Sequence, residues 1–312
     1  MHTSSRPDDA AAEAALVGID WGTTQRRVMA LDRTGRWLRE FSDDEGLLKA
    51  AGRFRPALES ALQRIAPLAD APRVLLAGMV GSAQGWHEVS YLDSSVPLAE
   101  LPAHLFAVPD APAGLDCRIV PGLRWRGEGG HVDVMRGEET QLLGAVAQGH
   151  ADGVFVLPGT HSKWVSLREG RVERFATYLS GELFALLSQH GTLAPLMRES
   201  RDDDAAFAEG LAAAAGTALS NALFECRARV VSGEMPAASA REHLSGILIG
   251  SEWHDALWRF TAAHHGPLHL IGTPALAQRH QHAAQQLGVE LRILDAQGLQ
   301  CSAWRRLSTC LD

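Results

Sequence analysis

Two short segments combine glycine with hydroxyl side chains in a pattern that suits the binding of anionic oxygen atoms. Residues 20–24 read Asp-Trp-Gly-Thr-Thr, and residues 158–163 read Pro-Gly-Thr-His-Ser-Lys. Glycine allows a sharp turn, and successive backbone N–H groups in such a turn can form a cradle for phosphate. One such segment is common in ordinary hairpins, but two in one chain predict two contact points for a polyphosphate. The residues that we expect to bind it are Gly22, Thr23, Thr24, Gly159 and Thr160.

Charged and polar side chains beside these segments could complete the site. Asp20 could hold Mg²⁺, because this ion prefers carboxylate and water oxygens. We expect Lys163 to contact phosphate, the alternative being an ordinary solvated strand residue. His161 is either a phosphate contact or a hydrogen-bonded structural histidine, and the sequence favours neither interpretation.

A third segment, residues 135–141, reads Met-Arg-Gly-Glu-Glu-Thr-Gln and precedes an apolar helical run. Acids at a helix start are stabilised by the unpaired N–H groups there, whatever their function. They also suit catalysis, because phosphoryl transfer to a hydroxyl needs a carboxylate that accepts or orients its proton. Glu138 and Glu139 are therefore alternatives for a catalytic base. Arg136 could bind a substrate carboxylate with its fork of N–H donors.

Two glycine-containing loops each follow an expected strand. Residues 78–82 read Gly-Met-Val-Gly-Ser, and we expect Gly81 and Ser82 to contribute to substrate binding. Residues 271–274 read Ile-Gly-Thr-Pro and precede a helix. Gly272 and Thr273 could pack against the flat base of a nucleotide, because glycine lets the backbone approach a ligand closely. A routine strand-to-helix connection is the alternative.

The elements that must position these residues form two similar series. Apolar runs at 16–20, 27–31 and 37–41 predict a three-strand meander, followed by a helix over 46–66 and a strand at 73–77. Runs at 154–157, 163–167 and 172–178 predict a second meander, followed by a helix over 180–189. An offset of 137 residues places Gly22 on Gly159 and Thr23 on Thr160, and an offset of 135 places Gly35 on Gly170. We therefore predict an internal duplication.

The remaining pattern alternates strands with helices and indicates an α/β fold with a parallel component. We expect helices over 205–230, 242–262, 275–286 and 296–309, and strands at 269–271 and 290–294. The predicted organisation is a disordered tail over 1–15, a first domain over 16–150 and a second over 151–312. A cleft would separate the two duplicated domains, and the last helix could return to pack on the first one.

Composition excludes several classes of function. The chain has 312 residues and a formal charge of −8, without a basic block, which argues against binding of nucleic acid. Its most apolar stretch, 211–224, is too short and too interrupted to cross a membrane. Four scattered cysteines without a C-x-x-C pair argue against structural zinc and against disulfides, and favour the cytoplasm. We expect His280 to be a solvated surface residue, because no Cys or carboxylate accompanies it.

The order of these motifs resembles the sugar-kinase, heat-shock-protein and actin superfamily. Within it, the chain is similar to the 2-dehydro-3-deoxygalactonokinase family from Leu16 onward. The runs that carry the resemblance are Gly-Ile-Asp-Trp-Gly-Thr-Thr at 18–24, Met-Arg-Gly-Glu-Glu-Thr-Gln at 135–141, Leu-Pro-Gly-Thr-His-Ser-Lys-Trp-Val at 157–165 and Ser-Gly-Glu-Leu-Phe-Ala at 180–185. The run at 157–165 is the most specific of them.

The resemblance implies two actin-like, ribonuclease H-like domains and an ATP- and Mg²⁺-dependent kinase. Its substrate would be the 6-hydroxyl of 2-dehydro-3-deoxy-D-galactonate, with Glu138 or Glu139 as base, Asp20 at the metal and residues 272–274 at the nucleoside. One departure is that Leu157 and Pro158 stand where many superfamily members carry an acid. The alternatives are a kinase for the gluconate epimer or another small sugar acid, and a non-catalytic nucleotide-binding sensor. A homo-oligomer is compatible with the sequence.

Overall fold

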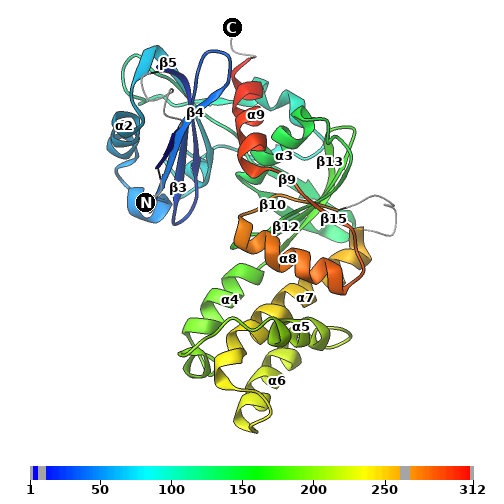
Figure 1. Ribbon diagram of the computed structural model, residues 1–312. Helices are drawn as coiled ribbons and strands as arrows, with labels where there is room; N and C mark the ends of the chain where they lie inside the picture. The colour runs from blue at the N-terminus through cyan, green and yellow to red at the C-terminus, as the bar shows by residue number, and fades with distance from the viewer. Residues whose placement is uncertain (1–2, 6–11, 261–267, 310–312) are drawn as a thin grey trace. The chain divides into compact units, whose positions relative to one another are not determined.

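The computed structural model describes residues 3–5, 12–260 and 268–309 and has an α/β fold, as the sequence predicts (Figure 1). The chain forms two compact units. The first unit comprises residues 1–152, 167–174 and 295–312, and the second comprises 153–166 and 175–294. The division of the chain into domains at residue 150 stays a prediction.

The sheet of the first unit has seven strands and begins with an antiparallel meander. The order is β1 (Thr3–Ser5), β4 (Trp37–Asp43), β3 (Arg26–Leu31), β2 (Ala14–Trp21), β5 (Leu68–Gly78), β8 (Asp116–Ile119) and β7 (Phe106–Ala107). Strands β2, β3 and β4 pair antiparallel, whereas β5 is parallel to both β2 and β8. Because β2 and β5 are parallel, their carboxyl ends, with Asp20 and Gly78, meet at one edge of the sheet.

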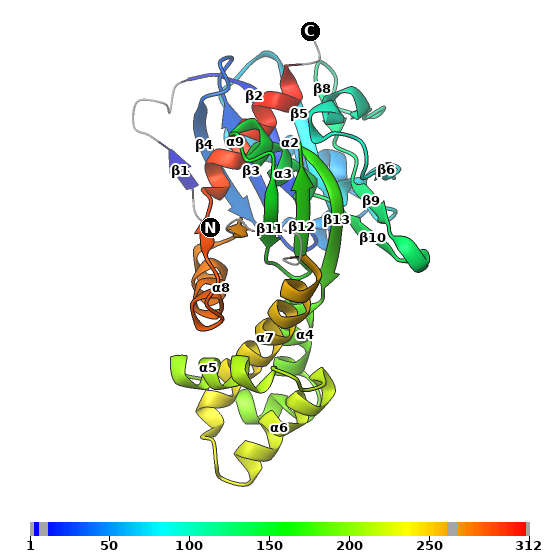
Figure 2. The same ribbon diagram turned by 90° about the vertical axis from the view of Figure 1, so that its right-hand side faces the viewer.

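The second sheet repeats this plan with five strands. Its order is β13 (Arg171–Tyr178), β12 (Ser162–Arg168), β11 (Gly153–Leu157), β14 (Leu268–Leu270) and β15 (Leu291–Ile293) (Figure 2). Strand β14 is parallel to β11 and to β15. The order β13-β12-β11-β14-β15 matches β4-β3-β2-β5-β8, so the predicted duplication is confirmed in strand order.

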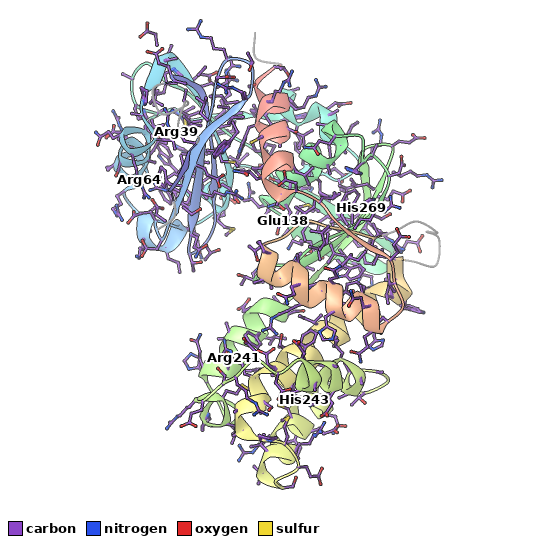
Figure 3. All side chains as sticks on the ribbon, viewed as in Figure 1. Arg39, Arg64, Glu138, Arg241, His243 and His269 are labelled. Carbon is purple, nitrogen blue, oxygen red and sulfur yellow. The ribbon has the colours of Figure 1, made fainter. Side chains whose placement is uncertain are left out.

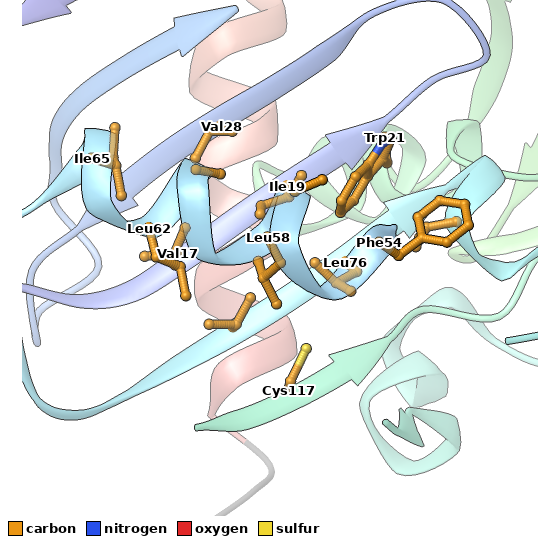
Figure 4. Close-up of a cluster of buried hydrophobic side chains, with 14 of the residues drawn as sticks. Val17, Ile19, Trp21, Val28, Phe54, Leu58, Leu62, Ile65, Leu76 and Cys117 are labelled. Atoms are coloured by element: carbon orange, nitrogen blue, oxygen red, sulfur yellow. The ribbon is translucent and has the colours of Figure 1, made fainter. Parts of the chain in front are cut away.

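Two helices of the first unit follow its meander, and a glycine separates them. The helix predicted over 46–66 is two helices, α1 (Leu47–Ala50) and α2 (Phe54–Ile65), because Gly52 between them has a φ of +73°. The apolar face of α2 packs on β2, β3 and β5, where Leu58, Leu62 and Val17 share one buried cluster (Figure 4). Burial of this face stabilises the helix more than its intrinsic propensity does.

Helix α3 (Glu138–Ala147) packs against α9 (Ala296–Ser308), the last helix of the first unit. A Cβ atom at Gly144 would lie 2.1 Å from the carbonyl oxygen of Leu299, so glycine there allows the two backbones to meet. A small three-stranded sheet, β10 (Val132–Met135), β9 (Leu123–Arg126) and β6 (Leu92–Asp93), leads into α3. Short 3₁₀ segments cover Met79–Gly81, Leu98–His104 and Glu128–Gly130.

The second unit adds a group of helices to its sheet. They are α4 (Ser180–Gln189), α5 (Asp204–Ala213), α6 (Leu219–Val231), α7 (Ala240–Phe260) and α8 (Pro274–Gln286), with 3₁₀ segments at Ala194–Met197 and Ala237–Ser239. The helix predicted over 205–230 is wrong as one element, because Gly216 takes a φ of +67° between α5 and α6. The other expected strands and helices occur within about five residues of their predicted bounds, and residues 261–262 of the helix expected over 242–262 lie outside the described residues.

The N-terminal prediction needs a correction. Thr3–Ser5 pairs with β4, and Ala14 and Ala15 belong to β2, so these residues are part of the sheet instead of a disordered tail. Residues 1–2 and 6–11 of the predicted tail lie outside the described residues. Within the described part of the chain, no helix is long and apolar enough to span a membrane.

Candidate active site

A half-buried carboxylate, Asp20, lies near the end of β2 beside two glycines. A Cβ atom at Gly78 would lie 3.2 Å from Oδ1 of Asp20, and one at Gly137 would lie 3.8 Å from it. Both glycines have positive φ, +86° and +114°, which other residues adopt only with strain. Burial raises the pKa of Asp20 to about 6, and repulsion from Glu138 adds to this, while Arg27 opposes it.

The two acids that the sequence left as alternatives have different surroundings. Glu139 is completely buried, and both of its carboxylate oxygens accept the N–H of Gly137, at 2.9 and 2.7 Å. Burial, together with repulsion from Glu138, raises the pKa of Glu139 to about 8. Glu138 is only half-buried, and its Oε2 accepts the N–H of Arg136 at 3.1 Å. Glu138 can therefore meet a ligand, whereas Glu139 faces the interior.

The residues around Asp20 are compatible with Mg²⁺. Among the described residues, no group of three or more His, Cys, Asp or Glu side chains could enclose a metal ion. Mg²⁺ does not require such a group, since it usually keeps several waters and binds one or two carboxylates together with substrate phosphates. A single carboxylate with glycine on two sides leaves space for these other ligands.

Arg136 leaves the turn between β10 and α3 and lies under the segment after β5. Its Nη2 donates to the carbonyl oxygen of Val89 at 2.7 Å, and its guanidinium lies 4.3 Å from the ring centroid of Tyr91. A Cβ atom at Gly81 would lie 2.8 Å from Nη1 of Arg136. Two predicted substrate-binding residues, Gly81 and Arg136, are thus in contact. The third, Ser82, donates its hydroxyl to the carbonyl oxygen of Met79 at 2.8 Å.

The first Gly-Thr turn is held by the helix that follows the meander. The N–H groups of Leu47 and Leu48 donate to the carbonyl oxygens of Gly22 and Thr23, at 2.9 and 3.1 Å. The side chains of Thr23 and Thr24 are exposed. The N–H of Gly22 donates within the turn to the carbonyl oxygen of Gln25 at 2.9 Å, so the hydroxyls of Thr23 and Thr24 are the groups that this turn exposes to a ligand.

The second Gly-Thr turn is held in the same way by α4. The N–H of Glu182 donates to the carbonyl oxygen of Thr160 at 2.9 Å, and a Cβ atom at Gly181 would lie 2.2 Å from the carbonyl oxygen of Gly159. Nε2 of His161 lies 2.6 Å from Oε2 of Glu182, and both side chains are about half exposed. His161 is therefore hydrogen-bonded, as one of its two interpretations requires, and a phosphate contact stays a prediction.

Lys163 is 5% exposed, so its interpretation as a solvated strand residue is wrong. Side chains alternate along a strand, which places Lys163 on the face of β12 opposite to Ser162 and Trp164. The role of Lys163 at phosphate stays a prediction.

A cavity of about 170 Å³ lies beside the second Gly-Thr turn, entirely within the second unit. Gly159, Gly181 and Arg241 contribute to its lining, and Arg241 lies on α7 with its guanidinium 4.7 Å from the ring centroid of Phe184 (Figure 3). A Cβ atom at Gly272 would lie 3.0 Å from Pro158, so the loop before α8 packs against the same turn. Thr273 caps α8 by accepting the N–H of Leu276 at 3.5 Å.

A buried carboxylate forms part of the wall of this cavity. Oε1 of Glu252 accepts Ser162 Oγ at 2.6 Å and Trp164 Nε1 at 2.8 Å, and Oε2 accepts Ser180 Oγ at 2.6 Å. These bonds connect α7 to β12 and to the first turn of α4. Both oxygens of Glu252 are thus engaged by side-chain donors of the protein.

His280 also lines the cavity, and its predicted exposure is wrong. It is 2% exposed, and its Nδ1 accepts the indole N–H of Trp253 at 3.0 Å. Burial lowers the pKa of His280. A histidine on α8 is buried here because the helix packs its inner face on α7, which no motif in the sequence indicates.

The sequence did not predict several residues that support the candidate site, namely Tyr91 beside Arg136 and the α7 residues that line the cavity. Tyr91 belongs to an irregular segment without a motif, and the α7 residues stand 80 to 90 positions after the turn that they support. The unbroken apolar period of α7 was the only available indication, and it predicts burial without predicting a partner.

Comparison with known proteins identifies the family of the chain. The model of the 2-keto-3-deoxy-galactonokinase family matches residues 20–307. A protein of Rhizobium meliloti (strain 1021) described as a probable 2-dehydro-3-deoxygalactonokinase is 38% identical over 288 residues, covering 89% of this chain and 91% of that protein. The 2-dehydro-3-deoxygalactonokinase of Escherichia coli (strain K12) is 34% identical over 279 residues, covering 89% and 92%.

A solved structure extends the similarity to three dimensions. A crystal structure from Sinorhizobium meliloti, to which the same activity is assigned provisionally, has a TM-score of 0.87 and 34% identity. The alignment covers 95% of this chain and 96% of that one. The fold is therefore the expected actin-like α/β fold. Since both the family model and these relatives span most of the sequence, the chain belongs to the 2-keto-3-deoxy-galactonokinase family.

Proposed function

We propose that this protein is an ATP-dependent kinase that phosphorylates the 6-hydroxyl of 2-dehydro-3-deoxy-D-galactonate in galactonate catabolism. Family membership supports the reaction class and the substrate. The observation that carries the proposal is that one turn of the first unit, 136–138, combines an accessible carboxylate with an arginine, beside the carboxylate of Asp20. A sugar acid presents both a hydroxyl and a carboxylate to such a site.

Glu138 is the residue that we assign as the base. Its half-buried carboxylate lies at the start of α3, where it can accept a hydrogen bond from the attacking hydroxyl and orient it. Glu139 is assigned a structural role, since it is buried and engages the N–H of Gly137. Asp20 would hold Mg²⁺, which when bound neutralises charge on the transferring phosphates.

Nucleotide binding is assigned to the second unit. The cavity beside Gly159 and Gly181 has a volume suited to part of a nucleoside, and the arginine and backbone N–H groups around it suit anionic groups. Thr160 and Lys163 are expected to contact phosphate, as are Thr23 and Thr24 of the first unit. A cytoplasmic location and the absence of nucleic-acid partners are part of the proposal too.

The experiment that tests the proposal is acid-dependent ADP release with Mg·ATP. The purified chain is given 2-dehydro-3-deoxy-D-galactonate, its gluconate epimer, or no acceptor. Turnover that favours the galactonate form supports both the reaction and the substrate. Equal use of both epimers would contradict the specificity but keep the reaction class. ADP release that does not depend on either acid would overturn the proposal in favour of another acceptor or a nucleotide sensor.

A further inference from the structure

The guanidinium of Arg136 is buried, and it has fewer hydrogen-bond acceptors around it than it has N–H donors. Its Nε and Nη1 atoms are inaccessible to solvent and have no hydrogen-bond partner among the residues that the structure describes. Only Nη2 is engaged, by the carbonyl oxygen of Val89. Buried donors in native proteins are almost always satisfied, so two unsatisfied nitrogens on one side chain require an explanation.

The guanidinium of Arg136 packs on an aromatic ring and not on a carboxylate. Tyr91 lies under it at 4.3 Å, within the range of a cation–π contact. On Gly122, a Cβ atom would lie only 2.8 Å from a ring carbon of Tyr91, so the Gly122 backbone limits how far the ring can move away. The glycine at position 81 leaves room for Nη1. The arginine is thus oriented by packing, and within the described residues it forms no salt bridge.

A carboxylate is the group that would satisfy these donors. Guanidinium presents several N–H donors in one plane and matches the geometry of a carboxylate, with charge-assisted hydrogen bonds that are stronger than neutral ones. The backbone N–H of the same Arg136 donates to Glu138, so the acid-binding group and the proposed base leave one turn. A ligand with a carboxylate and a hydroxyl a few carbons apart fits this arrangement.

Access to Nε and Nη1 requires the covering segment to move. Residues 81–89 are closed over Arg136 by two backbone bonds, Val89 N–H to the carbonyl of Gly81 at 3.0 Å and Trp86 N–H to that of Val80 at 2.8 Å. These two bonds are local, but the side chains of Trp86 and His87 also bond Asp110, at 3.0 and 2.6 Å, so a shift of the segment must break both contacts. The strands on either side can keep their pairing during such a shift.

We infer that Tyr91 is a positioning residue that presents Arg136 to the carboxylate of the sugar acid, and that residues 81–89 shift to admit it. This inference rests on the proposed function and names the part of the site that selects an acid over a neutral sugar. Tyr91 touches the arginine and not the reacting atoms, so it acts through Arg136.

Kinetics of the full chain with Tyr91→Leu and Tyr91→Phe test the inference. We expect Tyr91→Leu to raise KM for 2-dehydro-3-deoxy-D-galactonate about tenfold, because the guanidinium loses its aromatic support. KM for ATP should change less than about twofold, since the nucleotide site lies on other residues. Tyr91→Phe keeps the ring and should retain most of the affinity for the acid. If Tyr91→Leu does not fold, Tyr91→Met removes the aromatic face with little change in volume.

A second readout separates positioning from a general loss of structure. The acid and its carboxamide are compared as acceptors, and the KM for the carboxamide divided by the KM for the acid measures recognition of the carboxylate. This ratio should fall about tenfold in Tyr91→Leu and further in Arg136→Lys, without additivity in the double variant. An unchanged ratio in Tyr91→Leu would overturn the inference while leaving an active wild-type kinase. No acid-dependent activity in the wild type would instead overturn the proposed function.

Discussion

The two units repeat one strand order but carry different side chains at the ends of matching strands. In each, a Gly-Thr turn follows the first strand of a meander, and the N-terminus of a later helix donates to the carbonyls of that turn. Gly46 and Gly181 stand at these helix starts, 135 residues apart, and in both a Cβ atom would meet turn backbone, at 2.4 and 2.2 Å. The contact between a helix start and the turn backbone therefore occurs in both units, whereas the side chains at the two turns differ.

The side chains show where the copies diverged. The first meander strand of the first unit, β2, ends near Asp20, a half-buried carboxylate beside glycines. The matching position in the second unit is Leu157, which is buried. The second unit has its own carboxylate, Glu252, but three protein donors occupy it. The comparison shows that Asp20 and Glu138 of the first unit are half-buried, whereas Glu252 of the second unit is buried and joins the walls of a cavity.

The largest expected effect is on Glu138. Glu138→Gln removes the proposed base, and kcat should fall roughly a hundred- to ten-thousand-fold, the usual range for a general base. Binding of ADP should stay close to that of the wild type, because the cavity proposed for the nucleotide is lined by other residues. Acid-dependent ADP release and calorimetric ADP titration measure the two quantities. A variant with full turnover would remove Glu138 from the mechanism.

Glu252→Gln should produce the opposite pattern. The substitution weakens a buried network that joins α7, β12 and α4, and we expect a loss of about 2 kcal/mol in the free energy of unfolding. In the folded fraction, kcat should change far less than in Glu138→Gln. Urea unfolding and kinetics at saturating substrates check both parts, with Ser180→Ala as a control that removes only one donor. A large loss of kcat without a loss of stability would contradict the division between the two units.

Sequence reasoning located the turns, the acidic helix start and the glycine loops because each is a local pattern of a few residues. It could not distinguish Glu138 from Glu139, since both occupy the first turn of one helix and only packing decides which side chain is buried. It also missed Tyr91 and Glu252, which reach the sites through tertiary contacts over tens of residues. The sequence shows a glycine at 52 and at 216, but it does not show that each takes a positive φ and ends a helix. Helical periodicity on both sides of each glycine favoured one continuous helix instead.

A test within the first unit concerns the pH dependence of stability. The pKa of Glu139 is raised from 4.5 to about 8 in the folded state, so the folded chain holds a proton that the unfolded chain has released. The free energy of unfolding should therefore fall as pH rises toward 8, by at most about 1.4 kcal/mol per pH unit from this group. Between pH 6.5 and 8, Asp20, with a pKa of about 6, contributes little.

Glu139→Gln should flatten this slope, since the amide stays neutral and its oxygen can still accept the N–H of Gly137. Urea unfolding of the wild type and the variant at pH 6.5, 7.2 and 8 measures the difference. The variant should become relatively more stable as pH rises. Equal slopes for the two proteins would mean that Glu139 is ionised at neutral pH, and its assignment as a buried neutral acid would be wrong.

The smallest expected effect concerns the two glycines, Gly46 and Gly181, at which a helix start contacts a Gly-Thr turn. Gly181→Ala forces the start of α4 away from Gly159, so it should weaken ADP binding by about tenfold if the second turn holds the nucleotide. Gly46→Ala disturbs the first turn in the same way and is its matched control. If the first unit mainly carries the acceptor chemistry, Gly46→Ala should lower kcat more than it lowers ADP affinity. Equal losses of ADP affinity in the two variants would show that both turns bind the nucleotide alike, and that the copies diverged only in their acids.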